Sequence, residues 1–279
     1  SGPRLAPSGA MRPLPCLVRG GGLFLSTIIT HLYSLTTIRQ GVIITPYIRV
    51  TNMLTTRQSE LLKLVVESYI GSMQPIGSRF LSENGELTVS GATIRNELRA
   101  LEEAGFLTHP HTSAGRVPTE AGYQFYVENL MEETSVAAPE KEALGLIHKA
   151  HTEAQQAKEL AKALVELSGC AVLVSLGQNH MYYTGMSALF AQPEFKDYAR
   201  TVQISSVFDH CEDRLEDITR AAKEDVSILI GTNNPLGSGC TIVCAKLGDG
   251  KMMMLLGPMR MHYAKHKALL THLRELLAQ

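Results

Sequence analysis

The sequence predicts an α+β protein in which a small helical domain with a β-hairpin precedes a larger domain of helices and antiparallel strands. Three observations predict it: apolar residues at helical spacing after Met53, two extended pieces around the turn Ser113-Ala-Gly115, and strand-like apolar runs between helices in the second half. The 279 residues suffice for two hydrophobic cores. The expected parts are an extension over residues 1–52, the helical domain over 53–131, a linker over 132–141 and the second domain over 142–279.

The first 52 residues differ in composition from the rest of the chain. They contain five arginines and no Lys, Asp or Glu, while the remainder carries 21 basic and 27 acidic residues, a net charge of −6. An acid-free, arginine-rich start is typical of transit peptides, and Leu23–Ile29 resembles a weak secretory core. Because domain-like sequence begins directly after Met53, we interpret residues 1–52 as a non-native or disordered extension.

Three short helices are expected in the helical domain. Hydroxyl residues that can cap a helix precede the first apolar series, and Gly71 followed by Pro75 predicts its end. Ser90 is expected to cap the third helix, which Gly105 stops. The expected helices span residues 54–71, 78–83 and 90–104. Three helices at this spacing form a helix-turn-helix, whose last helix enters the major groove of DNA.

The third helix has an apolar face and a polar face. At about 100° per residue, Ile94, Leu98 and Leu101 share one side and should point into the core. The opposite side carries Ala92, Thr93, Arg95, Asn96 and Arg99. Arginine pairs with guanine, asparagine pairs with adenine, and small residues leave room for the thymine methyl group. An ordinary solvated surface helix would show the same pattern, so the hairpin that follows is needed to favour DNA.

Residues 106–118 are expected to form that hairpin, which would be the wing of a winged helix. Arg116, with Thr112 and Ser113, would reach phosphate or the minor groove at its tip. His109 and His111 alternate on one extended piece without a nearby cysteine, so we expect no metal there. The expected DNA-binding residues are Ser90, Ala92, Thr93, Arg95, Asn96, Arg99, His111, Thr112, Ser113 and Arg116.

Charge argues that one such domain binds DNA weakly. Residues 54–131 contain six basic residues and nine glutamates, a net charge of −3. Neutralisation of phosphates supplies most non-specific affinity for DNA. Tight binding would therefore need two copies of the domain on a two-fold symmetric site.

The second domain is expected to combine helices with an antiparallel sheet. A long helix over residues 140–168, rich in Ala, Glu and Lys, would either pair with its twin in a homodimer or lie on its own domain. The helix over residues 260–277 closes the chain. Strands are expected at residues 170–176, 226–230, 241–246 and 252–256, the last two joined across Gly248 to Gly250.

Four strings in the helical domain resemble the HrcA-type heat-inducible transcription repressors of bacteria. They are Leu54-Thr-Thr-Arg-Gln58, Pro75-Ile-Gly-Ser78, Ser90-Gly-Ala-Thr-Ile-Arg-Asn-Glu-Leu98 and Pro110-His-Thr-Ser-Ala-Gly-Arg-Val-Pro-Thr-Glu-Ala-Gly-Tyr123. The resemblance implies a winged helix followed by a GAF-like domain. It also implies a homodimer that binds double-stranded DNA at an inverted-repeat operator of chaperone genes, known as CIRCE, and represses by occupancy. Release on heating and activity supported by the chaperonin GroEL are implied as well.

The resemblance is thinner in the second domain. Residues 183–195 and 255–264 are similar to family segments, whereas Met259 and His262 depart from the residues expected there. In the helical domain, Gly91 departs from the serine expected at that position. Only five residues separate Leu176 from Tyr182, where the family carries an inserted dimerisation domain. Dimerisation is therefore assigned either to the long helix or to the GAF-like sheet.

Two other functions are kept as alternatives. Residues 233–239 form either the rim of a ligand pocket or an ordinary loop, so a regulator that responds to a small molecule is the first alternative. A zinc or redox enzyme is the second, from Cys240, Cys244, His262 and His266, although their spacing fits no standard zinc site. Buried strand cysteines and a solvated histidine face explain these residues equally well, and the standard catalytic motifs are absent. We expect no enzyme activity, metal or cofactor.

The cell compartment is expected to be the cytosol. Five scattered cysteines do not form a disulfide framework and fit a reducing environment. No apolar run reaches the roughly 18 residues that span a bilayer, so no membrane association is expected.

Overall fold

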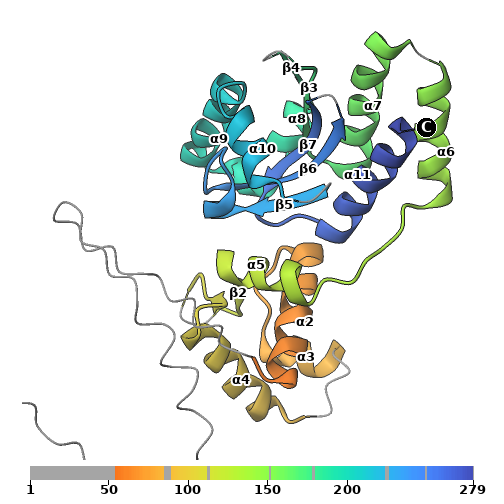
Figure 1. Ribbon diagram of the computed structural model, residues 1–279. Coiled ribbons are helices and arrows are strands. Elements are labelled where there is room, and N and C mark those ends of the chain that lie inside the picture. Colours follow the sequence, from red (N-terminus) through yellow and green to blue (C-terminus); the bar gives the residue numbers. More distant parts are fainter. Residues whose placement is uncertain are drawn as a thin grey trace, which may run out of the picture. The chain divides into compact units, whose positions relative to one another are not determined.

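The computed structural model describes residues 54–278, except 85–88, 112–113, 151, 178–179, 224–225 and 249. Residues 52–279 form one compact unit, which is described here by itself. The extension expected over residues 1–52 lies outside the described residues. The fold is α+β, as the sequence predicts (Figure 1).

The N-terminal part contains the three expected helices, α2 (Thr56–Ser72), α3 (Ser78–Asn84) and α4 (Gly91–Glu103). Thr55 and Gln58 form a capping box at the start of α2, since each side chain bonds the backbone of the other. The helix ends before Met73, whose φ of 58° is the left-handed conformation that terminates helices. The Ser90 side chain accepts from the Thr93 amide and caps α4. The predicted cap at Ser90 is confirmed, and Thr55 is the hydroxyl residue that caps the first helix, where the sequence predicts one.

A two-stranded hairpin and a fourth helix follow α4. Strand β1 (Leu107–Thr108) pairs antiparallel with β2 (Val117–Pro118), which leads into α5 (Glu120–Asn129). The side chain of Thr119 caps α5 by accepting from Gly122 N. Helix α5 packs on α2, and Tyr126 donates to Glu67 Oε1 at 3.1 Å. Helices α2 to α5 with this hairpin form a winged helix.

The C-terminal part is built on a five-stranded antiparallel sheet of order β4-β3-β7-β6-β5. Its strands are β3 (Ala171–Ser175), β4 (Met181–Thr184), β5 (Val226–Ile230), β6 (Cys240–Gly248) and β7 (Lys251–Pro258). Helices α6 (Ala138–Ala150), α7 (Glu153–Ser168) and α11 (Tyr263–Leu277) lie on one side of the sheet. The other side carries α8 (Met186–Phe190), α9 (Tyr198–His210), α10 (Leu215–Ala221) and the short 3-10 helix η1 (Pro193–Lys196). A second 3-10 helix, η2 (Gly231–Asn233), follows β5.

Helices on both sides explain why the strands read as continuous apolar runs. In β7, Met253 and Leu255 belong to the core on the α11 side, whereas Met252, Met254 and Leu256 belong to the core on the α9 side. Alternate side chains of a strand face opposite sides of the sheet, so both sets are buried. Met252, Met253 and Met254 are at most 2% exposed and all belong to the core.

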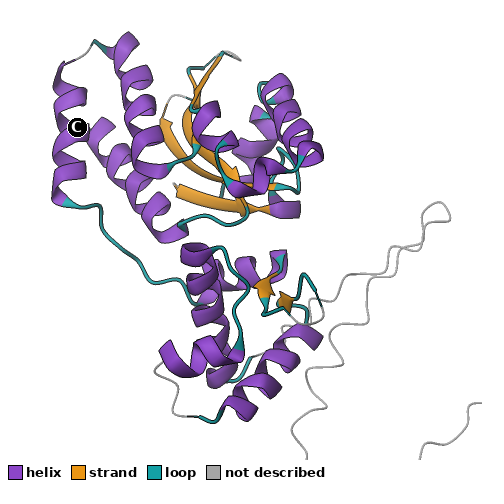
Figure 2. Cartoon of the chain, turned by 180° about the vertical axis from the view of Figure 1, so that it is seen from behind, coloured by secondary structure: helices purple, strands orange, loops and turns teal. Residues whose placement is uncertain are grey.

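The core on the α11 side continues into the winged helix. Tyr123 and Tyr126 of α5 pack against Tyr263 of α11, with ring centroids 5.9 Å and 6.5 Å apart. Gln124 Nε2 donates to the Ile230 carbonyl at the end of β5. The winged helix therefore docks on the C-terminal part through α5, at the end of the edge strand β5 (Figure 2).

The single helix expected over residues 140–168 is wrong. The structure has two helices instead, and Thr152 takes an extended conformation (φ −68°, ψ 156°) as the N-cap of α7. The two helices pack on each other, and Gln156 Nε2 donates to the His148 carbonyl at 2.7 Å. Threonine is favoured at an N-cap over a helix interior, but the Thr152 side chain makes no capping hydrogen bond, so the cap here is a matter of backbone conformation alone. Helix α6 also begins at Ala138, inside the stretch 132–141 that was expected to be a linker.

Two further differences lie in the C-terminal part. Strand β4 was not predicted, although it pairs with β3 from Val172–Thr184 to Ser175–Met181. Helix α11 begins at Tyr263 instead of Arg260. Arg260 precedes the helix, and its side chain binds Glu194 and the carbonyl of Ile70.

Candidate nucleic-acid interface

The predicted recognition helix α4 exposes the face that the sequence assigned to DNA. Ile94, Leu98 and Leu101 are at most 4% exposed and join the core of the winged helix. Ala92, Arg95, Asn96 and Arg99 are exposed, and Thr93 is half-buried because its hydroxyl lies 3.0 Å from Ser90 Oγ. The structure thus brings five of the expected DNA-binding side chains onto one surface, with Ser90 at the helix start.

Glu97 holds α4 against α2. Its carboxylate accepts from Gln58 Nε2 at 3.1 Å and lies 3.7 Å from Arg57 Nη1. These contacts lie on the side of α4 that faces α2. They therefore fix the orientation of the helix and leave the side chains of Arg95 and Asn96 unoccupied. Among the described residues, the side chains of Arg95 and Asn96 have no hydrogen-bond partner. Both remain available to base edges.

Arg99 is held by an exposed ion pair within the helix. Its Nε donates to Glu103 Oε1 at 2.9 Å, and the two side chains are 77% and 66% exposed. An exposed i,i+4 pair contributes only about 0.3–0.5 kcal/mol. Arg99 can therefore exchange Glu103 for a DNA phosphate at little cost.

Arg116 lies in a different place from the one the sequence suggested. Its backbone exchanges two hydrogen bonds with Ile76, of 2.9 Å and 2.8 Å, which attach the hairpin to the turn between α2 and α3. Its Nη2 lies 2.7 Å from Glu102 Oε2, and the side chain is 24% exposed. The expectation that Arg116 stands at the hairpin tip is therefore wrong, because Glu102 of α4 draws the guanidinium inward. Its contact with DNA stays a prediction.

The other wing residues expected to contact DNA are His111, Thr112 and Ser113. His111 is exposed, as a DNA contact requires. Thr112 and Ser113 lie outside the described residues. His109 pairs with Glu102 through Nδ1, so this histidine supports the wing.

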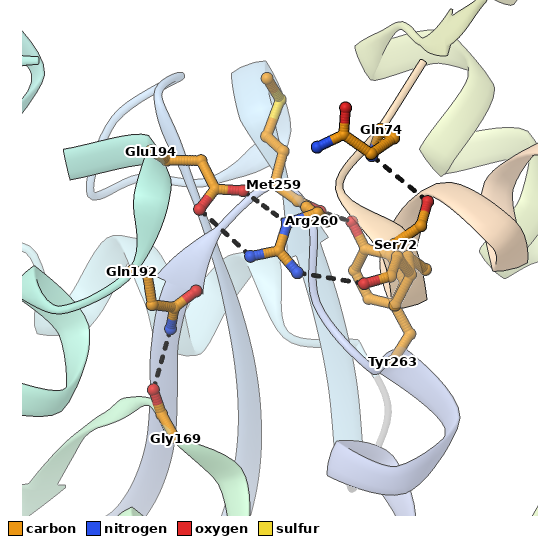
Figure 3. Close-up of polar contacts among 9 residues, drawn as sticks. Ser72, Gln74, Gly169, Gln192, Glu194, Met259, Arg260 and Tyr263 are labelled. Atoms are coloured by element: carbon orange, nitrogen blue, oxygen red, sulfur yellow. Dashed lines mark hydrogen bonds and ion pairs between the residues drawn. The ribbon is translucent and has the colours of Figure 1, made fainter. Parts of the chain in front are cut away.

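No sequence pattern predicts the contact between Arg260 and the C-terminal end of α2. Arg260 Nη1 donates to the Ile70 carbonyl at 3.1 Å, while Nε and Nη2 donate to the two oxygens of Glu194 at 2.5 Å and 3.2 Å (Figure 3). The Arg260 and Glu194 side chains are only 11% and 19% exposed. This ion pair connects the winged helix to η1 and to the end of β7. Its partners are separated by 66 and 190 positions, which no local pattern encodes.

A second contact attaches α5 to η2. Glu120 Oε1 accepts from the Thr232 amide at 2.8 Å. A Cβ at Gly231, where φ is 56°, would lie 2.2 Å from Glu120 Cδ. The absence of a side chain at Gly231 thus allows Glu120 to approach the backbone. With Arg260, this contact holds the winged helix at two separate points.

The two cysteines and two histidines considered for a zinc site, Cys240, Cys244, His262 and His266, are divided between the two sides of the sheet. No group of three or more metal-ligating side chains occurs in the part of the chain that the structure describes. Cys240 and Cys244 belong to the core on the α9 side of the sheet, while α11, which carries His266 and is preceded by its N-cap His262, packs on the other side. Burial raises the pKa of the Cys240 thiol to about 12 and that of Cys244 to about 11. Such thiols are not nucleophilic at neutral pH.

Residues 125–266 match the family model described as the HrcA protein C terminal domain. The chain is 47% identical over 129 residues to the heat-inducible transcription repressor HrcA of Roseiflexus castenholzii, which covers 46% of this chain and 34% of that protein. It is 43% identical over 127 residues to the protein of the same name from Chloroflexus aurantiacus, covering 45% and 32% of the two chains. The match thus spans about a third of the length of these curated relatives.

One solved structure shares the fold. A crystal structure titled as that of a hypothetical protein superposes with a TM-score of 0.63 at 16% identity, over 81% of this chain and 96% of that one. This likeness supports the arrangement of the winged helix and the sheet domain, and nothing about activity. Among the helices that the structure describes, none has the length and apolar content to cross a membrane.

Proposed function

Because the chain belongs to the HrcA family, we propose that it is a sequence-specific DNA-binding repressor of heat-shock chaperone genes. The observation that carries the proposal is helix α4, whose exposed face presents Arg95 and Asn96 without partners among the described residues. Arginine and asparagine are the side chains that read guanine and adenine in the major groove. The name of the relatives, heat-inducible transcription repressor, supports the same class of function.

Repression is proposed to work by occupancy of an inverted repeat of the CIRCE type. A homodimer would place two copies of α4 in successive major grooves, and the bound pair would exclude RNA polymerase from the promoter. Two copies are needed because residues 54–131 carry a net charge of −3 and gain little from phosphate neutralisation. The homodimer, activity supported by GroEL and a cytoplasmic location belong to this proposal. The proposal includes no catalytic activity.

Replacement of Arg95 or Asn96 by alanine tests the proposal. Each change should reduce discrimination between the CIRCE duplex and a scrambled duplex by about 1–3 kcal/mol, because one base contact is lost. Competition binding at fixed salt measures this difference. Arg220→Ala, which removes an exposed arginine of α10, is the matched control and should leave the discrimination unchanged. Intact sequence preference in Arg95→Ala and Asn96→Ala would show that α4 does not read the bases.

A further inference from the structure

A cavity of about 410 Å³ lies between the winged helix and the C-terminal part. The winged helix contributes Tyr69 of α2, Pro118 of β2 and Tyr123 of α5 to its wall. The C-terminal part contributes residues of η1 and α9, the loop 236–239 and the ends of β6 and β7. The volume falls within the range of sites for small molecules.

The hydroxyl of Tyr123 is the feature that points to a ligand. Tyr123 is only 3% exposed, yet its hydroxyl has no hydrogen-bond partner among the described residues. Its neighbours Tyr126 and Tyr263 donate to Glu67 and to the Met259 carbonyl, respectively. Burial raises the pKa of Tyr123, so the hydroxyl stays neutral and is a donor. The hydroxyl oxygen is not among the fully buried unpaired polar atoms, and Tyr123 lines the cavity, so this donor is open to an acceptor on a ligand there.

The charges on the wall favour an anion. Glu194 is neutralised by Arg260, which leaves Arg200 of α9 as a positive charge without an ion-pair partner among the described residues. Burial raises the pKa of Tyr69, and the charges of Glu194, Arg260 and Arg200 act on the same hydroxyl. Arg200, Tyr69 and Tyr123 are therefore donors among the residues that line the cavity.

Most of the remaining lining is apolar, apart from Gln203 and Ser238. It includes Val117 of β2, Phe195 of η1, Ile204 and Val207 of α9, and Leu236 of the loop. A compact polar anion such as phosphate would leave these apolar groups uncovered. An anion with an apolar body would cover them and still present an acceptor to the donors.

We propose that this cavity binds a small monocarboxylate with an apolar body, whose carboxylate accepts from Arg200 and from the hydroxyls of Tyr69 and Tyr123. Arginine is suited to a carboxylate because its planar donors match both oxygens. The apolar body would lie against Ile204, Val207 and Leu236. The occupant contacts both parts of the molecule, so it stabilises the docked position of the winged helix. Any effect of this on DNA affinity rests on the function proposed above.

Calorimetric titration of the full chain tests the site without DNA. The probes are sodium phenylacetate and sodium hexanoate, with phenylacetamide as the uncharged counterpart. At least one acid should give saturable binding, and the amide should bind at least about tenfold more weakly, since it lacks the charge that Arg200 attracts. Arg200→Gln should weaken binding of that acid at least about tenfold, and Tyr123→Phe by about three- to tenfold.

Two matched variants control for indirect effects. Tyr198→Phe changes a tyrosine of α9 that is 82% exposed, and Arg214→Gln changes an exposed arginine near α10; neither residue lines the cavity. Both should bind the acid like the unaltered chain. Tyr123→Phe should also keep the melting temperature, because only an unpartnered hydroxyl is lost, so weaker binding would not reflect unfolding.

Three results would overturn the site. The first is no saturable binding of either acid up to about 10 mM, a concentration beyond the range of weak ligands. The second is binding of the amide as tight as that of the acid. The third is binding of the acid to both Arg200→Gln and Tyr123→Phe as tight as to the unaltered chain. Competition binding to CIRCE with and without the acid is a separate arm. Failure of all DNA binding there would contradict the proposed function while leaving the carboxylate site standing.

Discussion

Arg260 shows how a single side chain holds the winged helix on the C-terminal part. Its guanidinium binds both oxygens of Glu194 and the last-turn carbonyl of Ile70 (Figure 3). Both partners are mostly shielded from water, so screening is weak and loss of the arginine would leave a carboxylate poorly solvated. In an exposed ion pair such as Arg220–Asp217, water solvates the carboxylate, so loss of the arginine costs little.

Replacement of Arg260 by methionine should therefore destabilise the protein strongly. We expect the free energy of unfolding to fall by about 2–4 kcal/mol, because Glu194 and the Ile70 carbonyl both lose their donor. Urea unfolding measures the change. Arg220→Met, which removes an arginine that is 74% exposed, should cost less than about 0.5 kcal/mol. Equal losses in the two variants would refute the role given to Arg260.

His266 makes stability depend on pH. The ring is 2% exposed, and its pKa is lowered from 6.5 to about 4 because burial disfavours the charged form, with repulsion from His262 and Lys265 adding to the effect. Between these two values the unfolded chain binds a proton that the folded chain does not. Stability is therefore complete above about pH 6.5 and is lost as the pH falls towards 4.

Unfolding at two pH values isolates this histidine. Between pH 7.5 and pH 5.0 its protonation should cost about 2 kcal/mol of the free energy of unfolding. His266→Leu removes the titrating ring, so the variant should lose about 2 kcal/mol less than the unaltered chain over the same interval. If urea titrations give the same pH dependence for both proteins, His266 is not the group responsible.

At the level of elements, helix boundaries were predictable where one local interaction decides them. Thr55 and Ser90 cap helices as the sequence suggests, and Ile94, Leu98 and Leu101 are buried as their spacing requires. The break at Thr152 was missed because α6 and α7 both have helix-forming composition. The inward turn of Arg116 was missed because it depends on Glu102, a residue of another element.

Two helical glycines give opposite predictions for alanine. A Cβ at Gly122 in α5 would lie 2.2 Å from the Phe106 carbonyl oxygen, whereas one at Gly145 in α6 would meet nothing within 4 Å. Gly122→Ala should therefore force α5 away from β1 and lower the free energy of unfolding by at least about 2 kcal/mol. Gly145→Ala should raise it by about 0.5–1 kcal/mol through helix propensity. Melting curves that rank the two variants the other way would contradict the packing of α5.

At the level of the whole molecule, the sequence predicted the order of the domains but not how they join. The core on the α11 side runs from α2 through α5 to α11, and its residues are far apart in sequence. The cavity near Arg260 likewise exists only because α2, α5 and α9 meet. Local sequence patterns predict helix caps and buried helix faces, whereas contacts between residues far apart in the sequence depend on the complete fold.

The net charge of the chain bears on how the protein would bind DNA. After residue 52 the chain is acidic, with a net charge of −6, so non-specific attraction to DNA is weak. Sequence-specific contacts from two copies of α4 must then supply the affinity. This distinguishes the proposed mode of binding from that of a basic protein that coats DNA.

A salt-titrated mobility-shift assay of the full chain tests this claim most directly, using the CIRCE duplex, its isolated half-site and a scrambled duplex. The account predicts binding to CIRCE at least about 100-fold tighter than to the half-site, because two winged helices bind together. It also predicts about twice the dependence of affinity on salt for CIRCE, since twice as many phosphates are contacted. Equal affinity for CIRCE and its half-site, or no preference over the scrambled duplex, would contradict it.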